Sequence, residues 1–547
     1  MTGPTLWSAE TLVPLPVLLP LFAAGLTLAL HRYATAQRII SVVALVATTA
    51  ASAGLMVAAE SGPVVVDVGG WAAPVGIPLV ADRLAALMLT VSGVMLLCVL
   101  LYSLGQGIPE GEAESTAELD SDEARVGGAI PVAIFHPTYL VLAAGVANAF
   151  LTGDLFNLYV GFEILLAASA VLLTLGGTAE RIRAGSVYVI MALASSVLFL
   201  SAIALIYAAT GTVNMAQLAV RLGEIDPTVR LSLQLLLLLA FGIKAAIFPL
   251  SFWLPDSYPT APAPVTAVFA GLLTKVGVYS ILRTQTLIFP DDVRVDRILA
   301  VVALATMVIG ILGAVAQNDV KRLLSFTLVS HIGFMIFGVS LASEAGTAAA
   351  VFYVVHHISV QTALFLVVGL VEWRGGSTSL DRLGGLARLA PVLAVLFFVP
   401  AINLAGIPPL SGFLGKVGLL TAGVEDGSAL AWALVVGAVL TSLLTLYAVV
   451  KAWNKAFWQT APPEIEPEMR LPRNMAWPAG ALVAFGLGLT VAAGPLYGYA
   501  ERSAATTMDG YTYIEAVFPG GSDRGTGESV DVTEDAGDGD AAGGGQP

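Results

Sequence analysis

Four charged side chains interrupt otherwise apolar stretches of this sequence: Glu163, Lys244, Lys275 and Lys416. A lone charge in such surroundings is costly unless it is paired or neutralised. Desolvation favours the neutral amine of a lysine, so a buried lysine is able to take up and release a proton. Three such lysines face only one obvious acid. These residues therefore predict movement of protons or other cations.

Two other interpretations of the same residues stay open. Each charge can hold helices together through a buried ion pair. A lysine can also extend its long side chain from within a helix to the membrane surface. The second interpretation fits Lys244 and Lys275 least well, because both lie near the middle of their apolar runs.

Three histidines form a second group of titratable residues inside apolar runs: His331, His356 and His357. Histidine titrates closest to neutral pH and suits a proton relay, although a hydrogen-bonded core histidine is an equal alternative. Adjacent residues on a helix point about 100° apart, so His356 and His357 do not predict a metal site. His31 and His136 are expected in loops or at the ends of spans.

The composition requires a membrane environment for these charges. Of 547 residues, 57% are apolar and 12% are charged, whereas about a quarter are charged in soluble proteins. Apolar runs of roughly 20 residues recur, long enough to cross a bilayer. We predict an all-α integral membrane protein with about fourteen transmembrane helices. The expected spans are 11–30, 38–58, 79–104, 131–151, 155–175, 185–209, 231–254, 262–286, 297–316, 323–343, 347–371, 392–422, 427–450 and 474–499.

The loops predict an orientation and explain the acidity. The first span lacks the features of a cleaved signal, so we expect it to be retained. Placing both termini outside a plasma membrane puts fourteen Lys and Arg residues in inside loops and eight outside, as the positive-inside rule favours. The net charge of −14 arises from residues 105–128 and 501–547. These segments are expected to be solvated and flexible, and an acidic docking tail is the alternative.

Several classes of function are disfavoured. Cys98 is the single cysteine, so neither a disulfide framework nor a thiolate metal or iron–sulfur site is expected. No Gly-rich phosphate loop occurs between a strand and a helix, which disfavours nucleotide hydrolysis and dinucleotide binding. We expect no cofactor, no metal, no nucleic-acid partner and no redox chemistry on this chain.

Prolines predict two broken helices. One proline cluster surrounds Pro249 and Pro255 and precedes Lys275; another includes Pro408 and Pro409 and precedes Lys416. Irregular backbone at membrane depth survives only where it is buried or lines a wet cavity. The first region is followed by Leu-Thr-Lys-Val-Gly277 and the second by Leu-Gly-Lys-Val-Gly418. This local similarity suggests a transporter built from repeats.

At these positions the sequence resembles a known family. The motifs are Thr152-Gly-Asp-Leu-Phe-Asn-Leu-Tyr-Val-Gly-Phe-Glu163, Phe241-Gly-Ile-Lys244, Trp253-Leu-Pro-Asp256, Leu273-Thr-Lys-Val-Gly-Val-Tyr279, Gln317-Asn-Asp-Val-Lys-Arg322 and Ser330-His-Ile-Gly333. They resemble the antiporter-like subunits shared by Mrp-type sodium/proton antiporters and the membrane arm of respiratory complex I. The resemblance covers roughly residues 80–460, and the length of the chain and its Gly-Asp-Leu-Phe-Asn signature are most similar to the D subunit of the Mrp type.

The resemblance implies a fold of fourteen helices with two inverted five-helix repeats, each holding one broken helix. The implied segments are 1–104 (three N-terminal helices), 105–128 (acidic loop), 129–290 and 291–450 (the repeats), 451–499 (a loop and the last helix) and 500–547 (an acidic disordered tail). The resemblance also implies that the chain works with other membrane subunits of a hetero-oligomeric complex.

The resemblance assigns roles to individual positions. Glu163 matches the family's fifth-helix glutamate, and Lys244, Lys275 and Lys416 match the lysines of its seventh, eighth and twelfth helices. The relay histidines correspond to His331 and His357. The family often has a lysine four residues after the second histidine, where this chain has Gln361. An amide or water link is expected there in place of a titrating step.

Three classes of function follow. The leading prediction is a proton-translocating subunit of a sodium/proton antiporter, in which Glu163 pairs alternately with Lys244 and protons pass through Lys275 and the histidines toward Lys416. A proton-pumping subunit of an NADH-quinone or ferredoxin-linked oxidoreductase is the alternative. A purely structural membrane subunit is the third class, and the full set of charges disfavours it.

Overall fold

The computed structural model describes residues 8–106, 132–290, 292–463, 465 and 470–519, and it is predominantly helical. Within these ranges, thirteen helices are long and apolar enough to cross a membrane. They are α1–α2 (Ala9–Ala29), α3 (Ala34–Ala58), α4 (Arg83–Gly105), α5 (Val132–Leu151), α6 (Leu155–Thr174), α7 (Ala179–Thr210), α9 (Pro227–Ala245), α11–η5 (Ala263–Ile288), α13 (Val293–Ala316), α14 (Val320–Ser340), α15 (Glu344–Gly375), α19–η6 (Ala429–Trp458) and α20 (Arg473–Val491). The prediction of a helical, multi-pass membrane protein is confirmed.

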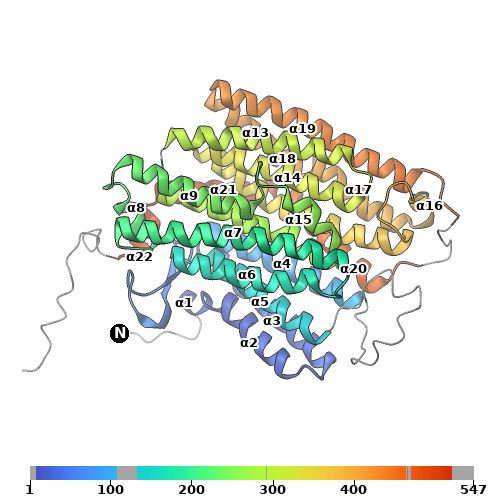
Figure 1. The fold of residues 1–547 in the computed structure, drawn as a ribbon, viewed down its shortest axis with the longest axis horizontal. Helices are drawn as coiled ribbons and strands as arrows, with labels where there is room; N and C mark the ends of the chain where they lie inside the picture. Colours follow the sequence, from blue (N-terminus) through green and yellow to red (C-terminus); the bar gives the residue numbers. More distant parts are fainter. Residues whose placement is uncertain (1–7, 107–131, 291, 464, 466–469, 520–547) are drawn as a thin grey trace, which may run out of the picture.

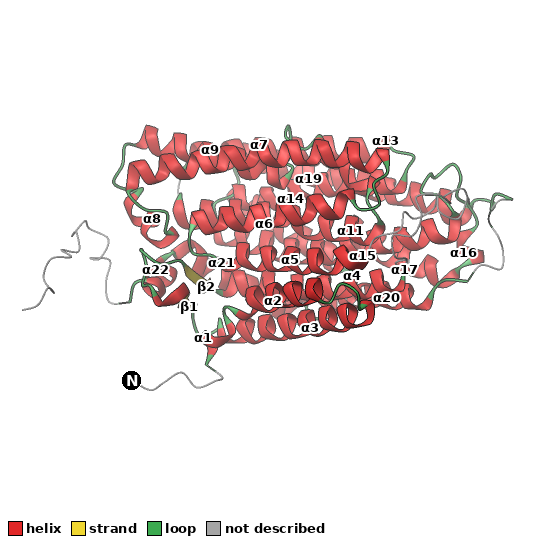
Figure 2. Cartoon of the chain, turned by 60° about the horizontal axis from the view of Figure 1, so that its bottom comes forward, coloured by secondary structure: helices red, strands yellow, loops and turns green. Residues whose placement is uncertain are grey.

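The long helices lie side by side with their axes roughly aligned (Figures 1 and 2). A hairpin of β1 (Val64–Asp67) and β2 (Pro78–Ala81) lies at one end of the bundle with α8 (Met215–Arg221) and α22 (Tyr511–Val517). We call this the hairpin end. The short helix α16 (Leu386–Leu389) lies at the opposite end, which we call the α16 end.

The helices differ in how much of their surface is buried against other parts of the protein, and some of the titratable groups lie on the most buried ones. The most apolar windows of α11–η5 and α15 are 100% buried in protein, whereas those of α1–α2 and α20 are only 33% buried. A helix surrounded by other helices can carry polar groups that lipid would not tolerate. Lys275 and His357 lie on these two enclosed helices, whereas the apolar windows of α6 and α9, which carry Glu163 and Lys244, are 56% and 50% buried.

Both predicted helix breaks are present. Helix α9 stops at Ala245 and α10 (Trp253–Ser257) follows; α17 (Pro391–Ala405) stops before Gly406 and α18 (Ser411–Asp426) follows. In the first break the amides of Ala246, Ile247 and Leu250 donate to the carbonyls of Ile243, Gly242 and Ile247. In the second, the amides of Gly406, Ile407 and Leu410 donate to Asn403, Ile402 and Ile407. The predicted span 392–422 is thus two short helices.

The matching segments of the two breaks are Ala245-Ala-Ile-Phe-Pro-Leu-Ser251 and Ala405-Gly-Ile-Pro-Pro-Leu-Ser411. The local similarity around Lys275 and Lys416 relates different structural elements, because Lys275 lies within the continuous helical run α11–η5 and Lys416 lies just after a break. Each break also contains a proline and a residue in the left-handed conformation. Ala246 (φ 57°) and Gly406 (φ 86°) both end their helices in that conformation.

Three further features differ from the predictions. Residues 79–81 form β2 rather than the start of a span, and Asp82 caps α4 by accepting a hydrogen bond from the Ala85 amide. Ordered helix continues beyond residue 500 in α21 (Ala493–Asp509) and α22, where a disordered tail was expected. Most of the acidic loop and residues 520–547 lie outside the described residues.

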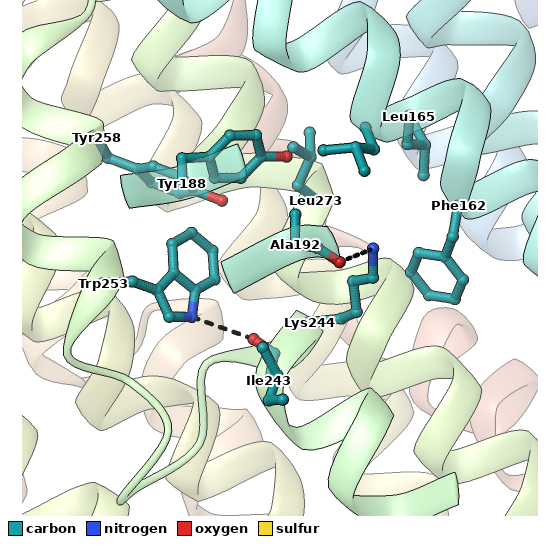
Figure 3. Close-up of a pocket in the computed structure, with 10 residues that line it drawn as sticks. Phe162, Leu165, Tyr188, Ala192, Ile243, Lys244, Trp253, Tyr258 and Leu273 are labelled. Carbon is teal, nitrogen blue, oxygen red and sulfur yellow. Dashed lines mark hydrogen bonds between the residues drawn. The ribbon is translucent and has the colours of Figure 1, made fainter. Parts of the chain in front are cut away.

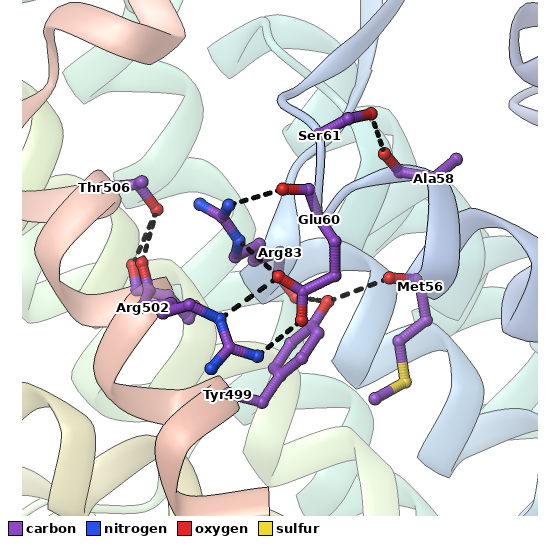
Figure 4. A network of polar contacts seen from close by, with 9 residues as sticks. Met56, Ala58, Glu60, Ser61, Arg83, Tyr499, Arg502 and Thr506 are labelled. Atoms are coloured by element: carbon purple, nitrogen blue, oxygen red, sulfur yellow. Dashed lines mark hydrogen bonds and ion pairs between the residues drawn. The ribbon is translucent and has the colours of Figure 1, made fainter. Parts of the chain in front are cut away.

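A polar network ties α21 to the N-terminal helices at the hairpin end (Figure 4). The guanidinium of Arg502 binds both carboxylate oxygens of Glu60, at 2.6 and 3.1 Å, and Arg83 Nε lies 3.3 Å from the same carboxylate. The Tyr499 hydroxyl donates to the Arg83 carbonyl at 3.2 Å. Hydrogen bonding by Arg502, followed by the charges of the two arginines, lowers the pKa of Glu60.

This network is predicted to make a small contribution to the stability of the fold that depends on pH. A carboxyl whose pKa is lower in the folded protein stabilises it above the unfolded pKa, and the contribution is lost as pH falls through the folded pKa. Because the pair is exposed, Glu60→Gln is expected to lower the Tm of the purified complex by about 1 °C at pH 7 and by less near pH 3. Glu224→Gln, on an exposed side chain, is the control. An equal Tm loss at both pH values would contradict the ion-pair explanation.

Candidate proton-transfer site

Glu163 and Lys244 face the same region from α6 and α9, and they are not in contact. The Lys244 ammonium donates to Ser196 Oγ at 3.3 Å and to the Ala192 carbonyl at 3.5 Å, and it lies 5.2 Å from the centre of the Phe162 ring (Figure 3). The buried Oε1 of Glu163 has no hydrogen-bond partner among the described residues. The two groups are near enough to interact electrostatically. The structure therefore holds the pair in an open arrangement.

Lys275 is completely buried on α12 (Thr274–Arg283). Its ammonium donates to the Ala270 carbonyl, within the π-helical turn Phe269–Leu273. A π turn displaces carbonyls from the regular hydrogen-bond ladder, which leaves one available to the lysine. Gly277 lets α12 approach α9 closely: a Cβ there would lie 2.6 Å from the Ala245 amide nitrogen. Close packing thus brings the Lys275 helix against the end of the Lys244 helix.

Histidines of α14 and α15 form a buried aromatic group. The ring centres of His331 and His357 lie 5.2 Å apart, and His331 Nδ1 lies 2.6 Å from the Tyr353 hydroxyl. Both ring nitrogens of His357 are buried and have no hydrogen-bond partner within the described part of the chain. His356 points to a different helix, where its Nδ1 lies 3.0 Å from Ser411 Oγ on α18. The adjacent histidines therefore serve different contacts.

Gln361 is fully buried one turn after His357 on α15. Its Nε2 donates to the Leu324 carbonyl at 2.8 Å, and its Oε1 has no partner among the residues described. The amide is oriented by one bond and keeps an acceptor free. This geometry is compatible with the amide or water link expected at this position.

Lys416 lies at the second helix break. Its ammonium donates to the carbonyls of Leu404 and Ala405, at 3.3 and 2.9 Å, and lies 5.0 Å from the centre of the Phe334 ring. These carbonyls end α17, where the helix dipole favours a cation. Lys244 occupies the last turn of α9, the corresponding helix end at the first break. The ammonium of Lys244, however, contacts α7 rather than the carbonyls that end its own helix.

The titratable groups form a series that extends from one helix break to the other. Lys244 lies at one break, Lys275 follows on the next helix, the histidines come between, and Lys416 lies at the other break. His357 lies within electrostatic range of Lys275, His331 and Lys416. In the described ranges, no group of three or more His, Cys, Asp or Glu side chains is arranged to hold a metal ion.

Comparison with known proteins places this geometry in a family. Residues 152–441, which include all the site residues named above, match the model of the NADH:quinone oxidoreductase/Mrp antiporter transmembrane family. The chain belongs to this family.

Individual members of the NADH:quinone oxidoreductase/Mrp antiporter family cover nearly the whole chain. The D subunit of the Na(+)/H(+) antiporter of Alkalihalophilus pseudofirmus is 39% identical over 93% of this chain and 99% of that relative. Its counterpart in Bacillus subtilis is 36% identical over 92% and 99%. A chain of the Mrp complex from a Dietzia species superposes with a TM-score of 0.83, at 33% identity over 93% of this chain and 99% of that one. The predicted family is confirmed.

Sequence reasoning about this family member missed a buried ion pair. Arg283 is one of the eight Lys and Arg residues counted outside the membrane, yet it is buried on α12 and its guanidinium lies 2.7 Å from the Asp82 carboxylate. The Tyr279 and Tyr513 rings flank it. The available signal was a charge within the apolar run 262–286. His136, expected at a span end, is also buried, with Nδ1 3.0 Å from Ser41 Oγ.

Proposed function

We propose that this chain is the proton-translocating membrane subunit of a multisubunit sodium/proton antiporter, and that Glu163, Lys244, Lys275, His331, His357 and Lys416 carry the protons. The observation that carries the proposal is the row of titratable groups that extends from one helix break to the other. Three lysines there have no carboxylate within ion-pair distance among the described residues. Groups held without counter-charges suit repeated protonation and release.

The first transfer takes place at Glu163 and Lys244. When their charged groups meet, the carboxylate stabilises the ammonium; when they separate, as in the arrangement observed, the ammonium retains only neutral acceptors. Opening the pair therefore favours loss of the lysine proton. Lys275, on the helix packed against α9 through Gly277, is the next acceptor.

The second half of the path runs from Lys275 to Lys416. His357 and His331 supply ring nitrogens between the two lysines, and Gln361 orients the adjacent turn.

We also propose that α17 and α18 form the two halves of a fourteenth crossing, that the matching breaks belong to two inverted repeats, and that the α16 end faces the cytoplasm. That end carries Lys321, Arg322, Lys451 and Lys455, as the positive-inside rule favours.

Glu163→Gln tests the first transfer. The amide keeps the size of the side chain but cannot stabilise the Lys244 ammonium by charge. Antiport by the complete complex in everted membrane vesicles is expected to fall about tenfold or more, with unchanged assembly of the complex. Glu180→Gln, on an exposed side chain at the start of α7, is the matched control. Wild-type antiport in Glu163→Gln would contradict the proposed role.

A second function has one specific observation in its favour. An archaeal respiratory complex, the membrane-bound sulfane sulfur reductase, contains a chain that superposes with a TM-score of 0.82, at 25% identity over 93% of this chain and all of that one. The alternative is a proton-pumping subunit of a redox-linked complex. Purifying the native complex and identifying its subunits separates the two: iron–sulfur or flavin subunits support redox pumping, and their absence together with other antiporter subunits supports antiport.

A further inference from the structure

A small cavity lies beside Lys244 and contains a polar group that the proposed path does not use. The cavity measures about 30 Å³, and its wall includes Lys244, Tyr188, Trp253 and Tyr258. Figure 3 shows these side chains around one space between the end of α9 and helix α7 (Ala179–Thr210). A water molecule needs roughly 10–15 Å³ of such volume and two to four polar partners. The cavity has room for at least one.

Tyr258 is the unusual member of this wall. Its side chain is completely buried, and its hydroxyl has no hydrogen-bond partner among the described residues. The neighbouring Tyr188 hydroxyl is bonded to Ser169 Oγ at 2.6 Å. A buried hydroxyl without a partner costs free energy comparable to a lost hydrogen bond. Phenylalanine would avoid that cost, so the hydroxyl requires an explanation.

The surroundings of Tyr258 indicate what the hydroxyl binds. Trp253 and Phe269 hold the ring, with ring centres 5.6 and 5.5 Å from its own. The Trp253 indole is itself fixed by donating to the Ile243 carbonyl at 3.2 Å. The Lys244 ammonium donates two long hydrogen bonds and has a third proton to donate. Tyr258, with its ring held rigidly, and Lys244, with an incompletely bonded ammonium, thus line the same cavity.

The position of Tyr258 in the chain connects the cavity to the α16 end. It follows α10 directly, and Asp256 of that helix is exposed and pairs with Arg322 at 2.9 Å. Only one residue, the buried Ser257, separates the exposed carboxylate from the buried phenol. The segment after the first break therefore runs from the surface of the bundle to the Lys244 cavity.

We propose that Tyr258 is a positioning residue that holds water in this cavity for proton exchange with Lys244. The inference rests on the proposed function of Lys244. In one direction the ammonium gives a proton to the water oxygen, leaving neutral amine and hydronium, and the hydronium releases its extra proton toward the α16 end. Loading of Lys244 is the reverse. The phenol keeps its own proton and fixes the water by hydrogen bonding.

Tyr258→Phe in the complete complex tests this role. Antiport in everted vesicles is expected to fall about tenfold, and the ratio of rates in H₂O and D₂O is expected to rise because proton transfer becomes slower than the other steps. The Tm should be unchanged or higher, since a buried polar group is removed. A purely structural role would lower the Tm and leave the isotope ratio unaltered.

Tyr102→Phe is the matched control, because the Tyr102 hydroxyl is equally buried and without a partner in the described structure, but does not line this cavity. Equal antiport rates and isotope ratios in Tyr258→Phe and Tyr102→Phe would overturn the inference. Lys244→Ala separates the role of Tyr258 from that of Lys244. If Lys244→Ala is inactive and Tyr258→Phe is normal, only the role of Tyr258 is overturned. If Lys244→Ala is active, the proposed function of the lysine itself is overturned.

Discussion

Replacing Lys275 with methionine is expected to abolish antiport without weakening the fold. The ammonium is completely buried, and the backbone carbonyl of Ala270 is its hydrogen-bond acceptor. Methionine has similar length and no charge, so the variant loses the titrating group and removes a desolvated one. Replacing a buried charge with an apolar group of similar volume is often neutral or stabilising. Activity should therefore fall to the level of vesicles lacking the complex, with an equal or higher Tm.

Sodium-dependent proton movement in everted vesicles, together with the Tm of the purified complex, measures the two effects. Lys455→Met is the control, because this lysine is partly exposed and pairs with Asp381 at 2.6 Å at the α16 end. Loss of both activity and assembly in Lys275→Met would indicate a structural role for the lysine. Retained antiport would remove Lys275 from the proposed path.

The second large expected effect is on stability, at the buried pair Asp82–Arg283. Arg283→Met leaves the Asp82 carboxylate without its guanidinium partner in a site where both side chains are almost fully enclosed. Breaking a buried pair from one side costs about 3–5 kcal/mol, because the remaining charge is desolvated and uncompensated. The Arg283→Met complex should show a clearly lowered Tm and poor accumulation in membranes.

A double variant separates charge from packing at this site. Asp82→Asn combined with Arg283→Met removes both charges, and the asparagine oxygen can still cap α4 at the Ala85 amide. Most of the lost stability should return in the double variant. If the double variant is as unstable as Arg283→Met alone, the arginine contributes through packing with Tyr279 and Tyr513 rather than through its charge.

The comparison between sequence and structure is most informative at the helix breaks. Proline disfavours the interior of a helix, so the clusters around Pro249 and Pro409 made both breaks predictable, although the single prolines Pro20, Pro137, Pro400 and Pro478 lie inside helices. The short similarity around Lys275 and Lys416 misled, because it compared side chains and not backbone conformation. The two breaks are alike in that Ala246 and Gly406 take left-handed conformations, and the residue type does not indicate that conformation for Ala246.

Arg283 illustrates the opposite limit. Counting charges in loops treats every arginine near a predicted span end as exposed, which fails when another segment brings an acid to it. Asp82 lies two hundred residues earlier in the chain, and only the packing of α12 near the start of α4 joins them. The β1–β2 hairpin and the ordered helices α21 and α22 were missed for the same reason, since their stability depends on tertiary contacts.

The sequence by itself determined the membrane environment, the family and the identities of the titratable groups, because hydropathy and buried charge are properties of residue types in order along the chain. Tertiary structure decided which groups meet. It separated Glu163 from Lys244, placed His357 beside His331, and directed Lys416 to the carbonyls that end α17. It also placed Tyr258, whose hydroxyl has no partner among the described residues, in the wall of the Lys244 cavity. Distances between helices arise only from packing, and proton transfer depends on those distances.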